Sequence, residues 1–172
     1  QMIYLNIGSN LSSSFGDKID NIVKSISLLK KLNVKILDIS NIYQTPSYPI
    51  RSFPKFNNVT IKLESPIKPN DFFIEMKKIE KKIGRIKSPK NQPRVCDIDI
   101  IDYNGLILTN SNLQIPHPRM HKRNFVLYPL KDVSPEWQHP IFKKKIDYFL
   151  NQLNQKAHIE ITRLNKNDIF KI

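Results

Sequence analysis

The sequence predicts one domain that mixes α-helices with β-strands. Its 172 residues are enough to bury a single core, and 40% of them are hydrophobic. Short apolar runs rich in β-branched residues alternate with longer stretches whose apolar residues recur every three or four positions. The first pattern is typical of strands and the second of amphipathic helices. Because no run reaches about 18 apolar residues, we expect no membrane-spanning segment.

The first half of the chain is predicted to hold three strands and two helices. The strands cover residues 2–7, 34–43 and 56–63, and the helices cover 18–31 and 70–83. Asp17 is the expected N-cap of the first helix, and Gly8-Ser9-Asn10 forms a tight turn before it. Residues 44–55 form a proline-containing loop. Its aromatic residues either cover a planar ligand or anchor the loop on the core, and both interpretations stay open.

The second half begins with a predicted strand over residues 97–103. Asn104-Gly105 is typical of a hairpin turn after it. Apolar residues from 125 to 130 are expected in the core, and an amphipathic helix is expected over 141–153. We therefore place one folded domain at residues 1–156 and a polar C-terminal tail or linker at 157–172.

Two carboxylates stand out at the start of the fourth strand. Asp97 and Asp99 are two positions apart, so a strand points both to the same face. Two such groups repel each other unless water solvates them or a cation bridges them. A solvated strand end and a Mg²⁺ site are both compatible with this pattern alone. The single cysteine, Cys96, excludes an internal disulfide and a Cys-rich zinc site, and we expect it to be buried.

The formal net charge of +13 indicates an anionic ligand or a general compositional drift towards Lys, Ile and Asn. Four cations, at positions 85, 87, 90 and 94, lie in the ten residues of loop that precede the acidic strand. They are either a solvated basic loop or the partners of a metal-bound polyphosphate. A second cluster, from Ile115 to Phe125, combines two histidines with three cations, and His117 lies between two prolines.

Taken in order, these stretches resemble the 6-hydroxymethyl-7,8-dihydropterin pyrophosphokinase family of folate biosynthesis. The resemblance covers roughly residues 2–153. It rests on Ile7-Gly8-Ser9-Asn10-Leu11, Tyr43-Gln44-Thr45-Pro46, Phe56-Asn57-Asn58, Ile79-Glu80 with Gly84-Arg85, Pro93-Arg94-Val95-Cys96-Asp97-Ile98-Asp99-Ile100, and Ile115-Pro116-His117-Pro118-Arg119-Met120 with Arg123 and Phe125. The resemblance implies a ferredoxin-like α+β sandwich with a mainly antiparallel sheet. It also implies transfer of pyrophosphate from ATP to the pterin hydroxymethyl group, which yields AMP.

The resemblance also implies a role for individual residues. The implied catalytic residues are Arg85, Arg94, Asp97 and Asp99, and the two aspartates are the implied ligands of two Mg²⁺ ions. The implied pterin-binding residues are Gly8, Asn10, Thr45, Pro46, Tyr48, Phe56, Asn58 and Phe125. The implied ATP-binding residues are Lys77, Glu80, Lys87, Lys90, Arg94, Ile100, His117 and Arg123.

The basic loop departs from the family pattern. Asn91 stands where relatives commonly carry an aromatic residue that closes over the pterin, and lysines at 87 and 90 replace frequent arginines. An inactive pterin or nucleotide binder is therefore one alternative, and a basic nucleic-acid-binding module is another. Under the main hypothesis we expect a cytoplasmic, monomeric domain that binds neither nucleic acid nor membrane. Because some relatives are fused to other folate enzymes such as dihydropteroate synthase, the chain is also a candidate module of a longer polypeptide.

Overall fold

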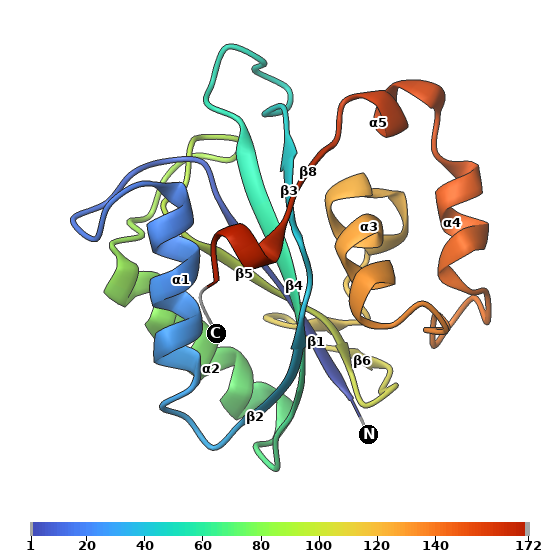
Figure 1. Cartoon of the computed structure of the whole chain (residues 1–172). Helices are drawn as coiled ribbons and strands as arrows, with labels where there is room; N and C mark the ends of the chain where they lie inside the picture. Colours follow the sequence, from blue (N-terminus) through green and yellow to red (C-terminus); the bar gives the residue numbers. More distant parts are fainter. Residues whose placement is uncertain (1, 171–172) are drawn as a thin grey trace.

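The computed structural model describes residues 2–170, and an antiparallel sheet organises them (Figure 1). The strands of this sheet follow the order β5-β1-β4-β3-β8, and β2 also pairs with β4. Their bounds are β1 Ile3–Ser9, β2 Lys35–Ile39, β3 Ile42–Thr45, β4 Phe56–Glu64, β5 Asp97–Tyr103 and β8 Thr162–Leu164. A separate small sheet pairs β6 (Leu108–Thr109) with β7 (Gln114–Ile115).

Helices cover both faces of the sheet. Helices α1 (Lys18–Leu29) and α2 (Pro69–Ile83) lie on one face, whereas α3 (Asn124–Val133) and α4 (Ile146–Gln152) lie on the other (Figure 1). Shorter helical turns are α5 (Gln155–Ile159), η1 (Met120–Lys122) and η2 (Lys166–Asp168). From β1 to β5 the order along the chain is strand, helix, three strands, helix, strand. Strands β2 and β3 both pair with β4 and act as one interrupted strand, which gives the ferredoxin-like order. The predicted α+β fold with a mainly antiparallel sheet is thereby confirmed.

Strand β1 separates two cores by its alternation. Leu5 and Ile7 pack against α1 and α2, whereas Tyr4 packs against α3 and α4. Because successive side chains point to opposite faces, Asn6 and Gly8 share the face of Tyr4. The sheet therefore presents to α3 a polar patch, formed by the Asn6 side chain and the backbone at Gly8, near the end of an otherwise apolar strand.

Several local predictions can be checked directly. Asp17 caps α1 through a capping box in which its side chain accepts from the backbone N–H groups of Ile19 and Asp20. Cys96 is 1% exposed, as expected for a small buried residue. Asn104 and Gly105 both have positive φ, at 56° and 72°, which is the conformation of a type I′ turn. The hairpin expected from that turn is wrong, because β6 pairs with β7 rather than with β5.

Two predicted elements are shorter than expected. The strand predicted over 34–43 divides into β2 and β3 at Ser40, whose hydroxyl accepts a hydrogen bond from the backbone N–H of Thr60 at 2.8 Å. The helix predicted over 141–153 begins only at Ile146. Residues before it form a turn in which Lys143 has a positive φ of 56°.

The C-terminal segment differs from the polar tail or linker expected at 157–172. Within the described residues, β8 pairs antiparallel with β3 and extends the main sheet. Ile169 and Phe170 pack on the core formed with α1 and α2. Residues up to Phe170 are thus integrated into the fold. Among residues 2–170, no helix has both the length and the apolar character needed to cross a membrane.

Candidate active site

A cavity of about 300 Å³ lies over the polar patch of the sheet. The strands β1, β4 and β5 form its floor, and the loop after β3, the basic loop before β5 and the start of α3 form its walls. The lining residues are Asn6, Gly8, Asn10, Thr45, Pro46, Ser47, Tyr48, Phe56, Asn58, Lys90, Asn91, Gln92, Arg94, Asp97, Asp99, Arg119, Arg123 and Phe125. The cavity thus combines carboxylates, cations and aromatic rings.

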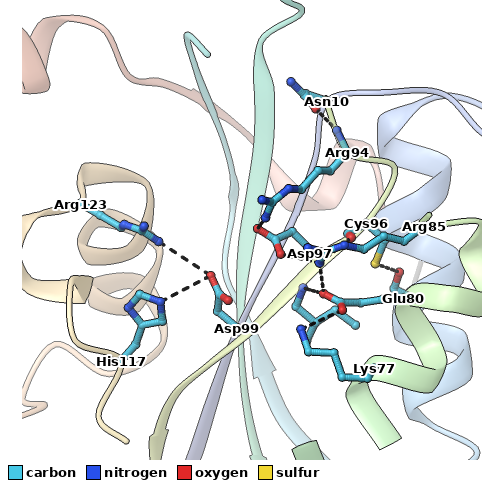
Figure 2. Close-up of polar contacts among 12 residues, drawn as sticks. Asn10, Lys77, Glu80, Arg85, Arg94, Cys96, Asp97, Asp99, His117 and Arg123 are labelled. Atoms are coloured by element: carbon cyan, nitrogen blue, oxygen red, sulfur yellow. Dashed lines mark hydrogen bonds and ion pairs between the residues drawn. The ribbon is translucent and has the colours of Figure 1, made fainter. Parts of the chain in front are cut away.

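Asp97 and Asp99 occupy the floor in two different charge environments (Figure 2). Asp97 pairs with two guanidinium groups, those of Arg85 at 2.8 Å and Arg94 at 3.2 Å. Asp99 faces the other wall, where its Oδ2 lies 3.8 Å from Arg123 and 4.0 Å from the Nε2 of His117. The two carboxylates therefore stand between two groups of cationic or hydrogen-donating side chains.

The pKa of Asp99 is raised to about 7, first by burial and then by the negative charge of Asp97. Burial has the opposite effect on His117, because it disfavours the charged imidazolium and lowers the pKa to about 4. The cations Arg123 and Arg119 add to this effect. His117 is therefore neutral near pH 7. Its Nδ1 accepts a hydrogen bond from the backbone N–H of Arg119 at 3.2 Å, so the proton is assigned to Nε2 on the side of Asp99.

Glu80 lies on α2 beside the carboxylate pair and holds the groups that position it. One oxygen of this buried carboxylate accepts from Arg85 at 2.6 Å and from the backbone N–H of Ile98 at 2.7 Å. The other oxygen pairs with Lys77 at 3.0 Å. Figure 2 shows Glu80 and Lys77 on the side of the two aspartates that is opposite to Arg123 and His117. Glu80 thus connects the helix, Arg85 and the backbone between the two aspartates.

Asn10 connects the two loops that border the cavity. Its Oδ1 accepts from the backbone N–H of Arg94 at 2.7 Å, and its Nδ2 donates to the Ser47 hydroxyl at 3.0 Å and to the Pro54 carbonyl at 3.1 Å. The residue is only 2% exposed. All these contacts are consistent with a side chain that holds the loops together.

The other end of the cavity is aromatic. Phe56 and Phe125 both line it, and the guanidinium of Arg123 lies 5.4 Å from the centre of the Phe125 ring. Asn6 donates to the backbone carbonyl of Phe125 at 3.0 Å and so attaches α3 to the sheet. A Cβ at Gly8 would lie 2.5 Å from the Oδ1 of Asn58, so any larger residue here would displace the buried Asn58 side chain.

Comparison with known proteins places this geometry in a family. A family model described as 7,8-dihydro-6-hydroxymethylpterin-pyrophosphokinase (HPPK) matches residues 4–135. The chain belongs to the HPPK family.

Two curated relatives illustrate the range of lengths in this family. The chain is 34% identical over 147 residues to a 2-amino-4-hydroxy-6-hydroxymethyldihydropteridine pyrophosphokinase of Aquifex aeolicus, which covers 86% of this chain and 89% of that protein. It is 42% identical over 139 residues to the folic acid synthesis protein FOL1 of Dictyostelium discoideum, which covers 81% of this chain but only 20% of that protein. The chain thus spans nearly all of one relative and a fifth of the other.

Solved structures support the fold. A Plasmodium falciparum HPPK-DHPS variant with pterin and p-hydroxybenzoate aligns with a TM-score of 0.69 at 16% identity, covering 94% of this chain and 47% of that chain. At this identity the likeness shows the fold alone. The HPPK fold of this chain therefore occurs elsewhere as part of a longer polypeptide.

The cavity brings together most of the residues that the HPPK resemblance implied. All eight implied pterin-binding residues line it, and so do Asp97, Asp99, Arg94, Lys90 and Arg123. The implied residues outside its lining are Lys77, Glu80, Arg85, Lys87, Ile100 and His117. Of these, Arg85 forms an ion pair with Asp97 and is itself paired with Glu80, and His117 lies near Asp99. The side chain of Ile100 is in the core, 4% exposed, so only its backbone could contact a nucleotide.

Five lining residues had been assigned no binding or catalytic role, namely Asn6, Ser47, Asn91, Gln92 and Arg119. Asn6 carried a usable signal, because a single amide interrupts the apolar run of the first strand. Ser47 carried no comparable signal in its polar loop.

The site supplies only part of the ligand set that a Mg²⁺ ion needs. Among the described residues, no group of three or more His, Cys, Asp or Glu side chains is placed to hold a metal ion. Two carboxylates on one strand face are nevertheless a suitable pair for Mg²⁺, which commonly takes one or two protein carboxylates and completes its shell with phosphate and water oxygens. Burial and then the charge of Asp97 raise the pKa of Asp99, and a cation bound to both carboxylates would relieve the second of these effects.

Proposed function

We propose that this chain transfers the β,γ-pyrophosphoryl group of ATP to the hydroxymethyl group of 6-hydroxymethyl-7,8-dihydropterin, with AMP as the second product. The observation that carries the proposal is that Asp97 and Asp99 adjoin an aromatic slot within one cavity. Membership in the HPPK family supports the same reaction. An aromatic slot suits a planar heterocycle, and the adjoining charged end suits a polyphosphate, so the two substrates can bind side by side.

The aromatic end suits the pterin. Phe56 and Phe125 offer ring faces for stacking, and the Asn58 amide can hydrogen-bond the edge of the heterocycle. Thr45, Pro46 and Tyr48 complete this wall, and the absence of a side chain at Gly8 lets the pterin approach the sheet. We assign this slot to the hydroxymethyl pterin.

The cationic end suits the triphosphate. Lys90, Arg94, Arg119 and Arg123 line it from two sides. We propose that Asp97 and Asp99 hold two Mg²⁺ ions together with phosphate oxygens, which would orient the triphosphate and reduce its charge. Lys87 lies in the same basic loop, beyond the cavity lining, and we assign it a peripheral contact with the nucleotide.

The reaction forms a bond from the hydroxymethyl oxygen to the β-phosphorus and breaks the bridging bond to the α-phosphate. Arg94, and Arg85 from below, stabilise the charge that develops on the transferred group. The hydroxyl proton passes to solvent water as the bond forms, and no dedicated side-chain base is required because positioning dominates phosphoryl transfer. Neutral His117, with its proton on Nε2, and Arg123 orient phosphate oxygens near Asp99.

A direct assay tests the reaction. The protein is incubated with ATP, Mg²⁺ and the hydroxymethyl pterin, and we expect AMP and pterin diphosphate in equal amounts. The double variant Asp97→Ala, Asp99→Ala should lose turnover, whereas Asp147→Ala, an exposed carboxylate on α4, should not. Unchanged turnover in the double variant would exclude this site. An inactive binder would bind the pterin without AMP formation.

The alternatives and the cellular setting remain predictions. A nucleic-acid-binding module would bind oligonucleotides with a steep salt dependence that is insensitive to Asp97. We further propose a cytoplasmic, monomeric domain that uses ATP and the pterin as its partners. Fusion to dihydropteroate synthase, or work beside it, is a separate proposal, supported by relatives and solved structures that are longer than this chain.

A further inference from the structure

The loop between β3 and β4 is attached to the molecule at two points. Inside, Ser47 donates to the Pro54 carbonyl at 2.7 Å and accepts from Asn10 at 3.0 Å, which holds the base of the loop. Outside, Arg51 forms an ion pair of 2.8 Å with Glu160. Glu160 belongs to the C-terminal segment, beyond residues 4–135 that the HPPK model matches. One partner of the outer attachment therefore comes from a part of the chain outside that match.

The outer attachment acts on a residue of the cavity wall. Tyr48 lines the cavity, and its ring lies 5.7 Å from the guanidinium of Arg51 and 5.9 Å from the ammonium of Lys156. Glu160 lies next to both cations, because its Oε1 is also 3.6 Å from Lys156. Two cations that contact the same aromatic ring are thus held by one carboxylate.

The loop has no carboxylate of its own. Residues 46–55 contain Arg51 and Lys55 but no Asp or Glu. The cavity beside the loop is lined by four cations, at positions 90, 94, 119 and 123, against two carboxylates, Asp97 and Asp99, so cations are in excess there. Without Glu160, Arg51 would have no anionic partner at this wall, and electrostatic repulsion from the cavity would disfavour its position over Tyr48.

The C-terminal segment that carries Glu160 is itself firmly placed. Strand β8 pairs with β3, with Thr162 opposite Gln44 immediately before the loop. On the other side, Asn124 donates to the Ala157 carbonyl at 2.8 Å, and the Tyr128 hydroxyl lies 2.6 Å from the Nδ1 of His158. Figure 1 shows this segment running from α4 through α5 to the edge of β3. Glu160 is therefore presented from a fixed support between α3 and the sheet.

We propose that Glu160 is a positioning residue for pterin binding: it holds Arg51 and Lys156 against Tyr48 and so keeps the wall of the pterin slot in place. The inference rests on the proposed function in assigning the slot to the pterin. Glu160 touches no substrate in this scheme and acts only through the loop.

Two measurements on Glu160→Gln test the proposal. Amide hydrogen exchange of the peptide spanning residues 47–53 should become faster, while exchange in β1 and β5 stays unchanged. The KM for the pterin should rise about threefold to tenfold, with kcat and the KM for ATP within about twofold, because partly exposed ion pairs and cation–π contacts are individually modest. The matched control is Glu136→Gln, which removes an exposed ion pair with Lys145 outside the cavity lining.

A double-variant cycle assigns the effect to the pair. Arg51→Gln should raise the pterin KM to a similar extent, and Arg51→Gln with Glu160→Gln should be no worse than the more affected single variant. Additive effects, or unchanged exchange in the loop, would overturn the proposal. Faster exchange with an unchanged pterin KM would also overturn the positioning role. Since exchange requires no turnover, an inactive wild type would contradict the proposed function but would still leave the attachment itself measurable.

Discussion

The Glu80 carboxylate accepts a hydrogen bond from the backbone N–H of Ile98 at 2.7 Å, so a side chain of α2 fixes the residue that lies between Asp97 and Asp99. The same oxygen accepts from Arg85, which in turn pairs with Asp97. A buried carboxylate thus determines both the position of the strand end and the direction of the guanidinium. Its contribution to activity would be indirect.

Replacing Glu80 with Gln should destabilise the protein by about 1 to 3 kcal/mol, because a buried charge network loses its anion while Arg85 and Lys77 keep their charges. We expect kcat to fall about tenfold or more as Arg85 and the strand end shift. Chemical denaturation and the AMP assay measure the two effects. The matched control is Glu75→Gln on the exposed face of the same helix, where loss of the Lys78 pair should cost less than about 0.5 kcal/mol. Equal effects of the two substitutions would contradict this role.

Asp99 should make the metal-free protein less stable as the pH rises. Its pKa is about 7 in the folded state but near 3.8 as the ordinary value, so between these values the folded state binds the extra proton. The free energy of unfolding therefore falls between about pH 4 and pH 7. Asp99→Asn should remove this component and be the more stable protein at pH 8 without Mg²⁺. Denaturation curves of both proteins at pH 5 and pH 8 test this, and parallel pH profiles would refute it.

His139 should produce the opposite trend. Burial lowers its pKa to about 4 from the ordinary 6.5, and its Nδ1 accepts from the backbone N–H groups of Ile141 and Phe142. The unfolded state then binds the extra proton, so stability is complete above about pH 6.5 and is lost as the pH falls towards 4. His139→Asn, which can still accept these hydrogen bonds, should flatten the profile in that window. Measurement of the melting temperature across this range distinguishes the two proteins.

Gly8→Ala should impair the pterin slot. The new Cβ would lie 2.5 Å from the Asn58 Oδ1, and the buried Asn58 side chain would have to move. We expect the pterin KM to rise about tenfold and the stability to fall by about 1 to 3 kcal/mol, with little change in the KM for ATP. Adding Asn58→Ala should restore stability, because the clashing group is removed, but not pterin affinity. Unchanged stability and an unchanged pterin KM in Gly8→Ala would contradict this prediction.

Asn10→Ala should loosen both loops at once. Removal of the amide leaves the Arg94 backbone N–H, the Ser47 hydroxyl and the Pro54 carbonyl without this partner. We expect a loss of about 2 to 4 kcal/mol in stability and higher KM values for both substrates. Ser47→Ala removes only part of this network and should have a smaller effect on the KM for ATP. A selective effect of Asn10→Ala on the pterin alone would instead favour direct contact with that ligand.

Local patterns predicted the parts of the fold that are locally determined. The Asp17 cap, the strand that begins at Asp97 and the helix ending before Gly84 all follow from residue type and spacing. The pairing of β8 did not, because Thr162-Arg163-Leu164 is too short to show an alternating pattern and its partner lies over a hundred residues earlier. The break at Ser40 also depends on a distant strand, since its hydroxyl bonds to Thr60.

The candidate site shows the same division. The resemblance on which Phe56, Phe125, Asp97 and Asp99 were named used ordered motifs, and all four line the cavity. It could not distinguish residues on the cavity wall from those beneath it. Glu80 was expected to contact ATP, yet both of its oxygens are already paired with protein groups. Whether a helix side chain faces the cavity or pairs with protein groups behind it depends on tertiary packing rather than on sequence spacing.

Strand β8 covers the edge of β3 and should thereby reduce self-association of the sheet. Without it, β3 would present unpaired backbone N–H and C=O groups along an edge, and such edges recruit strands from other molecules. β8 covers this edge with only three residues, and one of them is the charged Arg163, which makes it a poor template for a further strand. A polypeptide that stopped at residue 153 would retain the cavity-lining residues, the last of which is Phe125, but would expose that edge and should aggregate more readily.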